Sequence, residues 1–90
     1  MKTIDDLRRY LIDTFSQEEV FLFGSRARGD ASSYSDIDVA IGGPVPLDDR
    51  LTIARFVIEE SNLPHHVDLI DLSKSPWLEE TIRKEGIRWH

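Results

Sequence analysis

The chain has 90 residues, with 11 Lys or Arg, 17 Asp or Glu and a formal net charge of −6. This length predicts one domain, residues 1–90, with a thin core. The excess of acid argues against long nucleic acid as a partner, because non-specific binding depends on clusters of Lys and Arg. A small anion that binds together with a metal ion remains compatible with this charge.

Cysteine is absent, which excludes disulfides and thiolate zinc sites. No apolar run approaches the roughly 18 residues of a membrane-spanning helix, so we expect no contact with a membrane. The first ten residues lack the apolar stretch of a signal peptide. Together these features predict a cytoplasmic protein.

Apolar residues at helical spacing predict a first helix over 3–15. A short apolar run follows over 18–23 and is typical of a strand. It ends at Gly24-Ser25, where a short helical turn is expected to begin. Small and polar residues over 29–35 then indicate a loop.

The second half of the chain alternates strands and helices in the same way. Residues 36–41 alternate polar and apolar side chains, as in a half-buried strand. We predict a helix over 47–61, a strand over 67–72, a helix over 76–85 and a short closing strand over 87–89. The order predicts an α/β (α+β) fold with a single small mixed β-sheet and helices packed mainly on one side.

Three aspartates are the candidate chemical groups. Asp36 and Asp38 lie two positions apart on one predicted strand, so their side chains leave the same face, with Cα atoms about 6–7 Å apart. Two such carboxylates repel unless a cation lies between them, and a pair of Mg²⁺ ions meets that need. Asp68, on another predicted strand, is a candidate third ligand. The alternative is that Asp36 and Asp38 occupy the solvated face of an edge strand.

The Gly24-Ser25 turn is a candidate phosphate-binding element. A strand that ends in Gly-Ser and enters a helix presents backbone N–H groups and a hydroxyl to an anion. Such a turn can equally be a simple helix start. Asp71 competes with Asp68 for the third position, but its parity places it on the opposite face of the strand.

The nearby basic residues leave several readings open. Arg26 and Arg28 lie about 200° apart around a helix, so both cannot face the same phosphates. Arg28 can contact phosphate, brace the loop or pair with a neighbouring acid. His65 and His66 are adjacent, so they point in opposite directions on a strand and indicate a turn more than a metal site.

The spacing of these motifs resembles a known family. Gly24-Ser25, ten intervening residues and Asp36-Ile37-Asp38 match the GS-x10-D-x-D signature of the DNA polymerase β-like nucleotidyltransferase superfamily. Gly24 to Gly29, with Ser35 to Asp38, is similar to the minimal nucleotidyltransferases. The run Val67 to Leu72 resembles the strand that carries the third carboxylate. The resemblance spans residues 1–90.

The resemblance implies a polymerase β-like fold and a role for each motif residue. Gly24 and Ser25 would hold the triphosphate, with Arg28 as a further nucleotide contact. Asp36 and Asp38 would bind two Mg²⁺ ions, and Asp68 would bind the ion nearest the acceptor hydroxyl. The reaction implied is attack of a hydroxyl on the α-phosphorus of ATP, with release of pyrophosphate.

The resemblance also implies a partner. Minimal nucleotidyltransferases commonly pair with a HEPN-domain RNase toxin, and some attach AMP to a tyrosine of that toxin and so act as its antitoxin. The alternatives are an antitoxin that only occludes its partner, without catalysis, and a transferase that modifies an antibiotic. The base preference of the nucleotide and the oligomeric state stay open, and an oligomer is compatible with the sequence.

Overall fold

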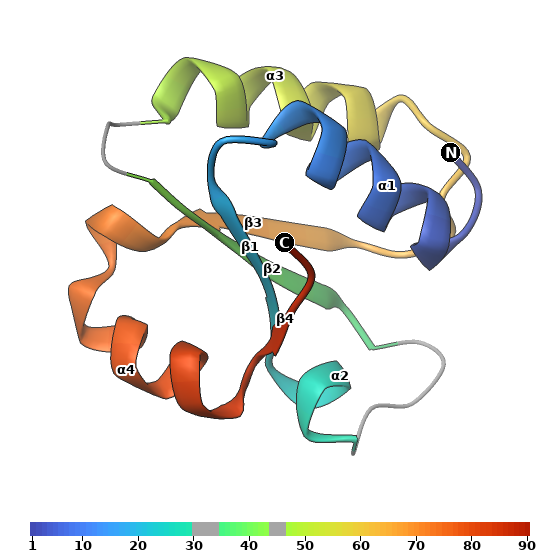
Figure 1. Cartoon of the computed structure of the whole chain (residues 1–90). Coiled ribbons are helices and arrows are strands. Elements are labelled where there is room, and N and C mark those ends of the chain that lie inside the picture. Colours follow the sequence, from blue (N-terminus) through green and yellow to red (C-terminus); the bar gives the residue numbers. More distant parts are fainter. Residues whose placement is uncertain (30–34, 44–46) are drawn as a thin grey trace.

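A computed structural model describes residues 1–29, 35–43 and 47–90 (Figure 1). Its centre is one mixed sheet with the strand order β3-β2-β1-β4. Strand β2 runs antiparallel to β1 and parallel to β3, and β4 pairs antiparallel with the other side of β1. The strands are β1 (Glu19–Phe23), β2 (Ile37–Gly42), β3 (Val67–Asp71) and β4 (Ile87–Arg88). The predicted α/β fold with one mixed sheet is confirmed.

Helices connect these strands close to the predicted positions. They are α1 (Ile4–Thr14), α2 (Ser25–Arg28), α3 (Asp48–Glu59) and α4 (Pro76–Glu85), with a 3-10 turn η1 (Leu72–Lys74) before α4. A reciprocal pair of hydrogen bonds between Thr3 and Asp6 caps α1. Within the described part of the chain, no helix has the length and apolar character needed to cross a bilayer.

The larger core lies between the sheet and the helices α1 and α3, which run side by side over one face (Figure 1). The alternation of each strand produces this core, because every second side chain points to the same face. Its members include Leu11, Leu51, Val20, Val39 and Leu69, one from each packed element. The prediction that the helices pack mainly on one side of the sheet is confirmed, because both α1 and α3 cover this face.

Helix α4 covers part of the opposite face. A smaller cluster of Phe21, Ala40, Leu72 and Ile82 packs there. Phe21 and Ala40 face each other across β1 and β2. The smaller core leaves the ends of the strands on this face free for polar side chains, and the candidate site lies at one of these ends.

Candidate active site

The register of the sheet brings two of the predicted aspartates together. Asp38 of β2 pairs in register with Asp68 of β3, and neighbours in register across parallel strands point to the same face. Both therefore lie on the α4 face, opposite the larger core. Asp36 directly precedes β2 and shares the parity of Asp38. The three acids thus gather where β2 and β3 begin and β1 ends.

The acids affect one another electrostatically. Burial raises the pKa of Asp38 above its ordinary value of 3.8, and the charges of Asp68 and Asp36 raise it further. His66 and Arg28 act in the opposite direction and lower this pKa. A carboxylate crowded by two others gains from a cation placed between them.

Gly24 brings the end of β1 against Asp38. Its φ of 75° is a conformation that L side chains rarely adopt. A Cβ atom added to Gly24 would lie 2.3 Å from the Oδ2 atom of Asp38. Both the backbone conformation and the close approach therefore require glycine. The predicted Gly-Ser turn lies directly against the candidate metal-binding carboxylates.

Ser25 begins α2 immediately after this glycine, and the short helix ends at Gly29 with φ 83°. Arg28 lies on the exposed side of α2 and is close enough to Asp38 to influence its pKa. A hollow of about 240 Å³ adjoins the turn. Its lining includes Phe23, Gly24 and Arg28, together with residues of α4. Gly24 and Arg28 thus lie next to both Asp38 and an open hollow, and Ser25 directly follows Gly24 in the chain.

Arg26 lies on a different side of α2 from Arg28. Its guanidinium donates to the backbone carbonyl of Ser35, with Nε 3.2 Å and Nη2 2.9 Å from the oxygen. Nη2 also lies 3.3 Å from Nδ1 of His65. The sequence left the roles of the two arginines open. The structure assigns the backbone contact to Arg26.

Asp71 occupies the opposite face of β3 from Asp68. It is 6% exposed, and its carboxylate accepts hydrogen bonds from the backbone N–H of Leu47 and from the N–H and hydroxyl of Ser73. Burial raises its pKa, but these hydrogen bonds outweigh burial and leave the pKa below its ordinary value. Asp71 therefore holds the start of α3 and η1, and it does not join the other acids.

His66 is a neighbour of the site that sequence reasoning missed. It lies two positions before Asp68, with the same parity, and its charge lowers the pKa of Asp38. The signal was present in the sequence, because residues two apart on a strand share a face.

The chain matches the model of the nucleotidyltransferase domain over residues 4–90. It belongs to that family. The resemblance predicted from the Gly-Ser and Asp-x-Asp motifs is thereby confirmed.

Among curated relatives, a protein of Haemophilus influenzae described as a probable protein adenylyltransferase MntA is 47% identical over 70 residues, covering 72% of this chain. The chain spans 59% of the length of that relative. Two solved structures share the nucleotidyltransferase fold over 96% of this chain.

The first solved structure is a toxin–antitoxin with AMP-PNP, with a TM-score of 0.74, 30% identity and 71% of that chain covered. The second is a mutant of the toxin–antitoxin MntA-HpeT in which two aspartates, two positions apart, are changed to glutamate. Its TM-score is 0.70, with 26% identity and 70% of that chain covered.

The residues of this nucleotidyltransferase domain suit a divalent cation in donor type. Carboxylate oxygens are the ligands that Mg²⁺ prefers. Within the described residues, however, no three acids or histidines already stand close enough together to hold an ion. Asp38 and Asp68 are neighbours in register, with Cα atoms about 4.8 Å apart as in any sheet. Rotation of side chains, with the strands unmoved, can therefore bring their carboxylates together.

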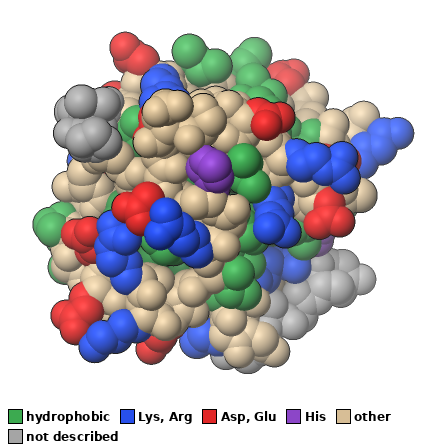
Figure 2. Space-filling model, in the orientation of Figure 1, with side chains coloured by type: hydrophobic (Ala, Val, Ile, Leu, Met, Phe, Trp, Pro, Cys, Tyr) green, Lys and Arg blue, Asp and Glu red, His purple; other side chains and the backbone are tan. Residues whose placement is uncertain are grey.

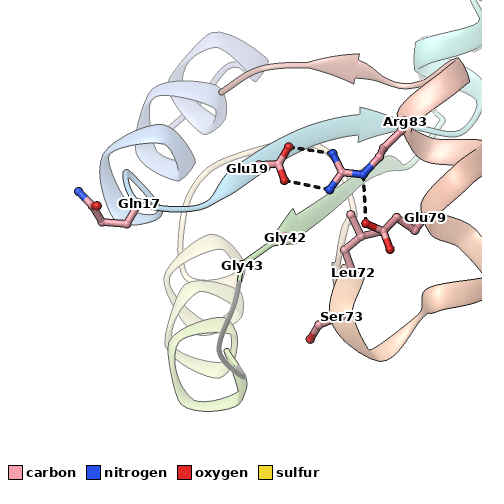
Figure 3. Close-up of a pocket in the computed structure, with 8 residues that line it drawn as sticks. All are labelled: Gln17, Glu19, Gly42, Gly43, Leu72, Ser73, Glu79 and Arg83. Carbon is pink, nitrogen blue, oxygen red and sulfur yellow. Dashed lines mark hydrogen bonds and ion pairs between the residues drawn. The ribbon is translucent and has the colours of Figure 1, made fainter.

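A second hollow, of about 380 Å³, lies at the other end of the sheet (Figure 3). Arg83 projects into it and donates to both carboxylate oxygens of Glu19, at 2.8 and 2.9 Å, and to Glu79 at 3.1 Å. The hydrogen bonds from Arg83 lower the pKa of Glu19. Because two carboxylates already occupy this guanidinium, the hollow is a poor site for a phosphate.

Charged side chains of both signs lie on the surface of the molecule. Figure 2 shows acidic and basic side chains interspersed on the face that it displays, without a continuous basic patch there. Several charged side chains of the described residues form ion pairs, such as Lys84 with Glu80 at 2.9 Å.

Proposed function

We propose that this nucleotidyltransferase domain transfers AMP from ATP to a hydroxyl of a partner protein in a reaction that depends on Mg²⁺. The partner is a HEPN-domain toxin, the acceptor is one of its tyrosines, and the domain acts as the antitoxin. The observation that carries the proposal is the meeting of three elements on one face of the sheet. Asp38 lies beside Asp68 in register, and Gly24 lies against the carboxylate of Asp38.

The relatives support the choice of nucleotide and partner. One is described as an adenylyltransferase, and a solved relative is a toxin–antitoxin with AMP-PNP, an ATP analogue. In another, two aspartates were changed that have the same spacing as Asp36 and Asp38. An Asp-x-Asp pair of this relative was thus the target of substitution, as expected for a pair with a chemical role.

In the proposed reaction, the acceptor oxygen attacks the α-phosphorus of ATP, and the bond from that phosphorus to the pyrophosphate oxygen breaks. Gly24 and Ser25 seat the triphosphate with backbone N–H groups and a hydroxyl, and Arg28 adds positive charge. A carboxylate oxygen of Asp68 receives the proton of the acceptor hydroxyl. The acceptor oxygen, the α-phosphorus and the leaving pyrophosphate oxygen are thereby held in line for displacement.

Asp36, Asp38 and Asp68 are the proposed ligands of two Mg²⁺ ions. When bound, these ions would offset the charge of the triphosphate and stabilise the charge that develops on the leaving pyrophosphate. Burial and then the charges of Asp68 and Asp36 raise the pKa of Asp38, and such crowding of carboxylates is expected where they are arranged to bind cations.

The direct test is to incubate the protein with ATP labelled at the α-phosphate, Mg²⁺ and the toxin encoded beside it. Label on a toxin tyrosine, lost with Asp38→Asn and with the chelator EDTA, is the expected result. Phenylalanine in place of the labelled tyrosine is the control for acceptor identity. If the toxin is neutralised but neither protein and no small molecule carries the label, the proposal is contradicted.

A second candidate function is neutralisation of the toxin by binding alone. The outer side of α3 favours it, because Ile53, Phe56 and Val57 there are 62%, 63% and 37% exposed. These residues lie at helical spacing on the face opposite the acids, so binding through them would not need the acids. Occlusion predicts that Asp38→Asn still protects the toxin's target RNA, whereas Phe56→Asp does not. Catalysis predicts loss of protection with Asp38→Asn.

A further inference from the structure

Arg26 contacts the two chain segments that lead into the acidic residues. Its Nε and Nη2 atoms both donate to the carbonyl oxygen of Ser35, which directly precedes Asp36. Its Nη2 atom also donates to Nδ1 of His65, three positions before Asp68. Arginine carries no acceptor, so the His65 nitrogen must be the acceptor in this contact. One side chain on α2 thereby joins the entrances of β2 and β3.

The sheet by itself does not hold Asp36. Strand β2 begins at Ile37, and its first ladder bond runs from the N–H of Ile37 to the carbonyl of His66 at 2.9 Å. Asp36 lies outside that ladder, and it repels Asp38 and Asp68 in the absence of a cation. A contact that fixes Ser35 therefore restricts the position of Asp36 directly.

Arg26 differs from Arg28 in the way it acts. Arg28 lowers the pKa of Asp38 through its charge, whereas Arg26 is held by its own hydrogen bonds. Its guanidinium points at a backbone carbonyl and an imidazole instead. The effect of Arg26 on the acids is thus geometric, through the segments that it joins.

We propose that Arg26 is a positioning residue that fastens the segments before Asp36 and Asp68 to each other and to α2, and so holds the carboxylates ready for cations. This inference rests on the proposed function for its catalytic consequence, although its structural consequence can be measured without catalysis. The planar fork of arginine is required, because two of its nitrogens share one carbonyl while one reaches the ring. Lysine offers a single nitrogen on a flexible stem and cannot reproduce this arrangement.

The test compares Arg26→Lys and Arg26→Ala with a matched control, Arg55→Ala. Arg55 also donates from Nη2 to a backbone carbonyl, that of Leu69 at 2.6 Å, and so ties α3 to β3 one residue after Asp68, whereas Arg26 bonds to the segments before Asp36 and Asp68. Three quantities are measured for each protein. They are amide hydrogen exchange over 35–38 and 65–68, the affinity for Mn²⁺ by electron paramagnetic resonance, and kcat and KM for AMP transfer to the toxin.

We expect both Arg26 variants to remain folded and to exchange faster at the amide of Ile37 in the metal-free protein. The affinity for Mn²⁺ should fall about tenfold, and kcat should fall at least as much, whereas KM for ATP should change less than about threefold. Arg55→Ala should leave all three quantities near those of the wild type, apart from a lower melting temperature.

His65 provides an independent variant pair. His65→Asn keeps an acceptor oxygen near the position of Nδ1, whereas His65→Ala removes it. We expect His65→Asn to retain more Mn²⁺ affinity and kcat than His65→Ala, a difference that loss of packing would not produce. Equal losses in the two variants would overturn the role of the imidazole contact.

The proposal is overturned if Arg26→Ala has the same amide exchange and Mn²⁺ affinity as the wild type. It is also overturned if Arg26→Ala loses no more Mn²⁺ affinity and kcat than Arg55→Ala does. If the wild type transfers no AMP, the proposed function fails, but the exchange comparison in the metal-free protein still decides whether Arg26 fastens the two segments. Faster exchange at Ile37 in Arg26→Ala then supports the fastening. Unchanged exchange contradicts it.

Discussion

The two aspartates of β3 lie three positions apart and have opposite surroundings. Asp71 points to the face covered by α1 and α3, is 6% exposed and accepts three hydrogen bonds, which leave its pKa below the ordinary value. Asp68 points to the α4 face, is exposed and raises the pKa of its neighbour Asp38. Identical side chains on one strand thus have different surroundings, and we propose different roles for them.

The contrast extends to the two faces of the sheet. One face carries the larger core, and its buried carboxylate is satisfied by donors from the protein. The other carries a small core and an end at which Asp38 and Asp68 are neighbours in register. A carboxylate satisfied by the protein stabilises the fold, whereas crowded carboxylates are suited to bind a ligand that the protein does not supply.

The largest effect is expected from substitution of the aspartates on the α4 face. Asp36→Asn and Asp38→Asn should each lower AMP transfer on the order of a thousandfold, equivalent to about 4 kcal/mol of transition-state stabilisation. The reason is that an amide is a much weaker ligand for Mg²⁺ than a carboxylate. The measurement is transfer of α-labelled AMP, with circular dichroism to verify folding. Transfer at the wild-type rate in either variant rules out the assignment of metal ligands.

Gly24→Ala should damage both activity and stability. The added Cβ would lie 2.3 Å from Oδ2 of Asp38, at a φ of 75° that alanine rarely adopts. To avoid this clash Asp38 must move, which should lower AMP transfer. The clash and the backbone strain should also lower the free energy of unfolding by about 1–3 kcal/mol. Urea denaturation and the transfer assay measure the two effects. Gly29→Ala, at a positive φ but with open space around the added Cβ, is the control for backbone strain alone.

Asp71→Ala should do the reverse of Asp38→Asn, with lower stability and nearly unchanged transfer. Removal of the carboxylate leaves the buried N–H of Leu47 and the partly buried N–H of Ser73 without their acceptor. We expect the free energy of unfolding to fall by about 1–3 kcal/mol. Transfer is measured at a temperature well below the melting transition, so that every molecule is folded. A loss of transfer comparable with that of Asp38→Asn would place Asp71 in the site.

The opposite pKa directions predict opposite dependences of stability on pH. The pKa of Asp38 is raised in the folded protein, so ionisation of Asp38 lowers stability as pH rises through that pKa. Without metal, Asp38→Asn should therefore melt higher at pH 7, by less than about 5 °C, with the difference vanishing in acid. Mg²⁺ should raise the melting temperature of the wild type more than that of the variant. If Asp38→Asn has a lower melting temperature than the wild type at pH 7, the result contradicts a raised pKa of Asp38 in the folded protein.

For Asp71 the sign is reversed. Its pKa is lowered in the folded protein, so its contribution to stability is present above the ordinary value of 3.8 and is lost as pH falls through the folded pKa. Asp71→Asn should therefore lower the melting temperature at neutral pH and flatten the loss of stability in acid. Melting curves of both asparagine variants across pH 3 to 8 would sharpen the contrast between the faces.

The smallest effect is expected at the opposite end of the sheet. Arg83 and Glu19 form a partly exposed ion pair, with side chains 41% and 31% exposed. Such pairs contribute little, so Arg83→Ala should change the free energy of unfolding by less than about 1 kcal/mol and leave transfer intact. Denaturation and transfer assays check both points. A loss of transfer would make the hollow around Arg83 part of the site.

The sequence alone indicated the mixed α/β fold, the Gly24-Ser25 turn and the Asp36-x-Asp38 pair. Local patterns sufficed for these features, because strand alternation and the spacing of a motif are properties of neighbouring residues. Parity along a single strand even separated Asp68 from Asp71. The match to the nucleotidyltransferase domain confirmed the family that these spacings suggested.

The tertiary structure decided what neighbouring residues cannot encode. Sheet register places Asp38 beside Asp68, thirty positions later, and the same pairing brings His66 near the acids. The contact from Arg26 to Ser35 and His65 depends on where α2 lies relative to two strand entrances. Register and helix placement follow from packing of the whole core, so local patterns could not predict these contacts.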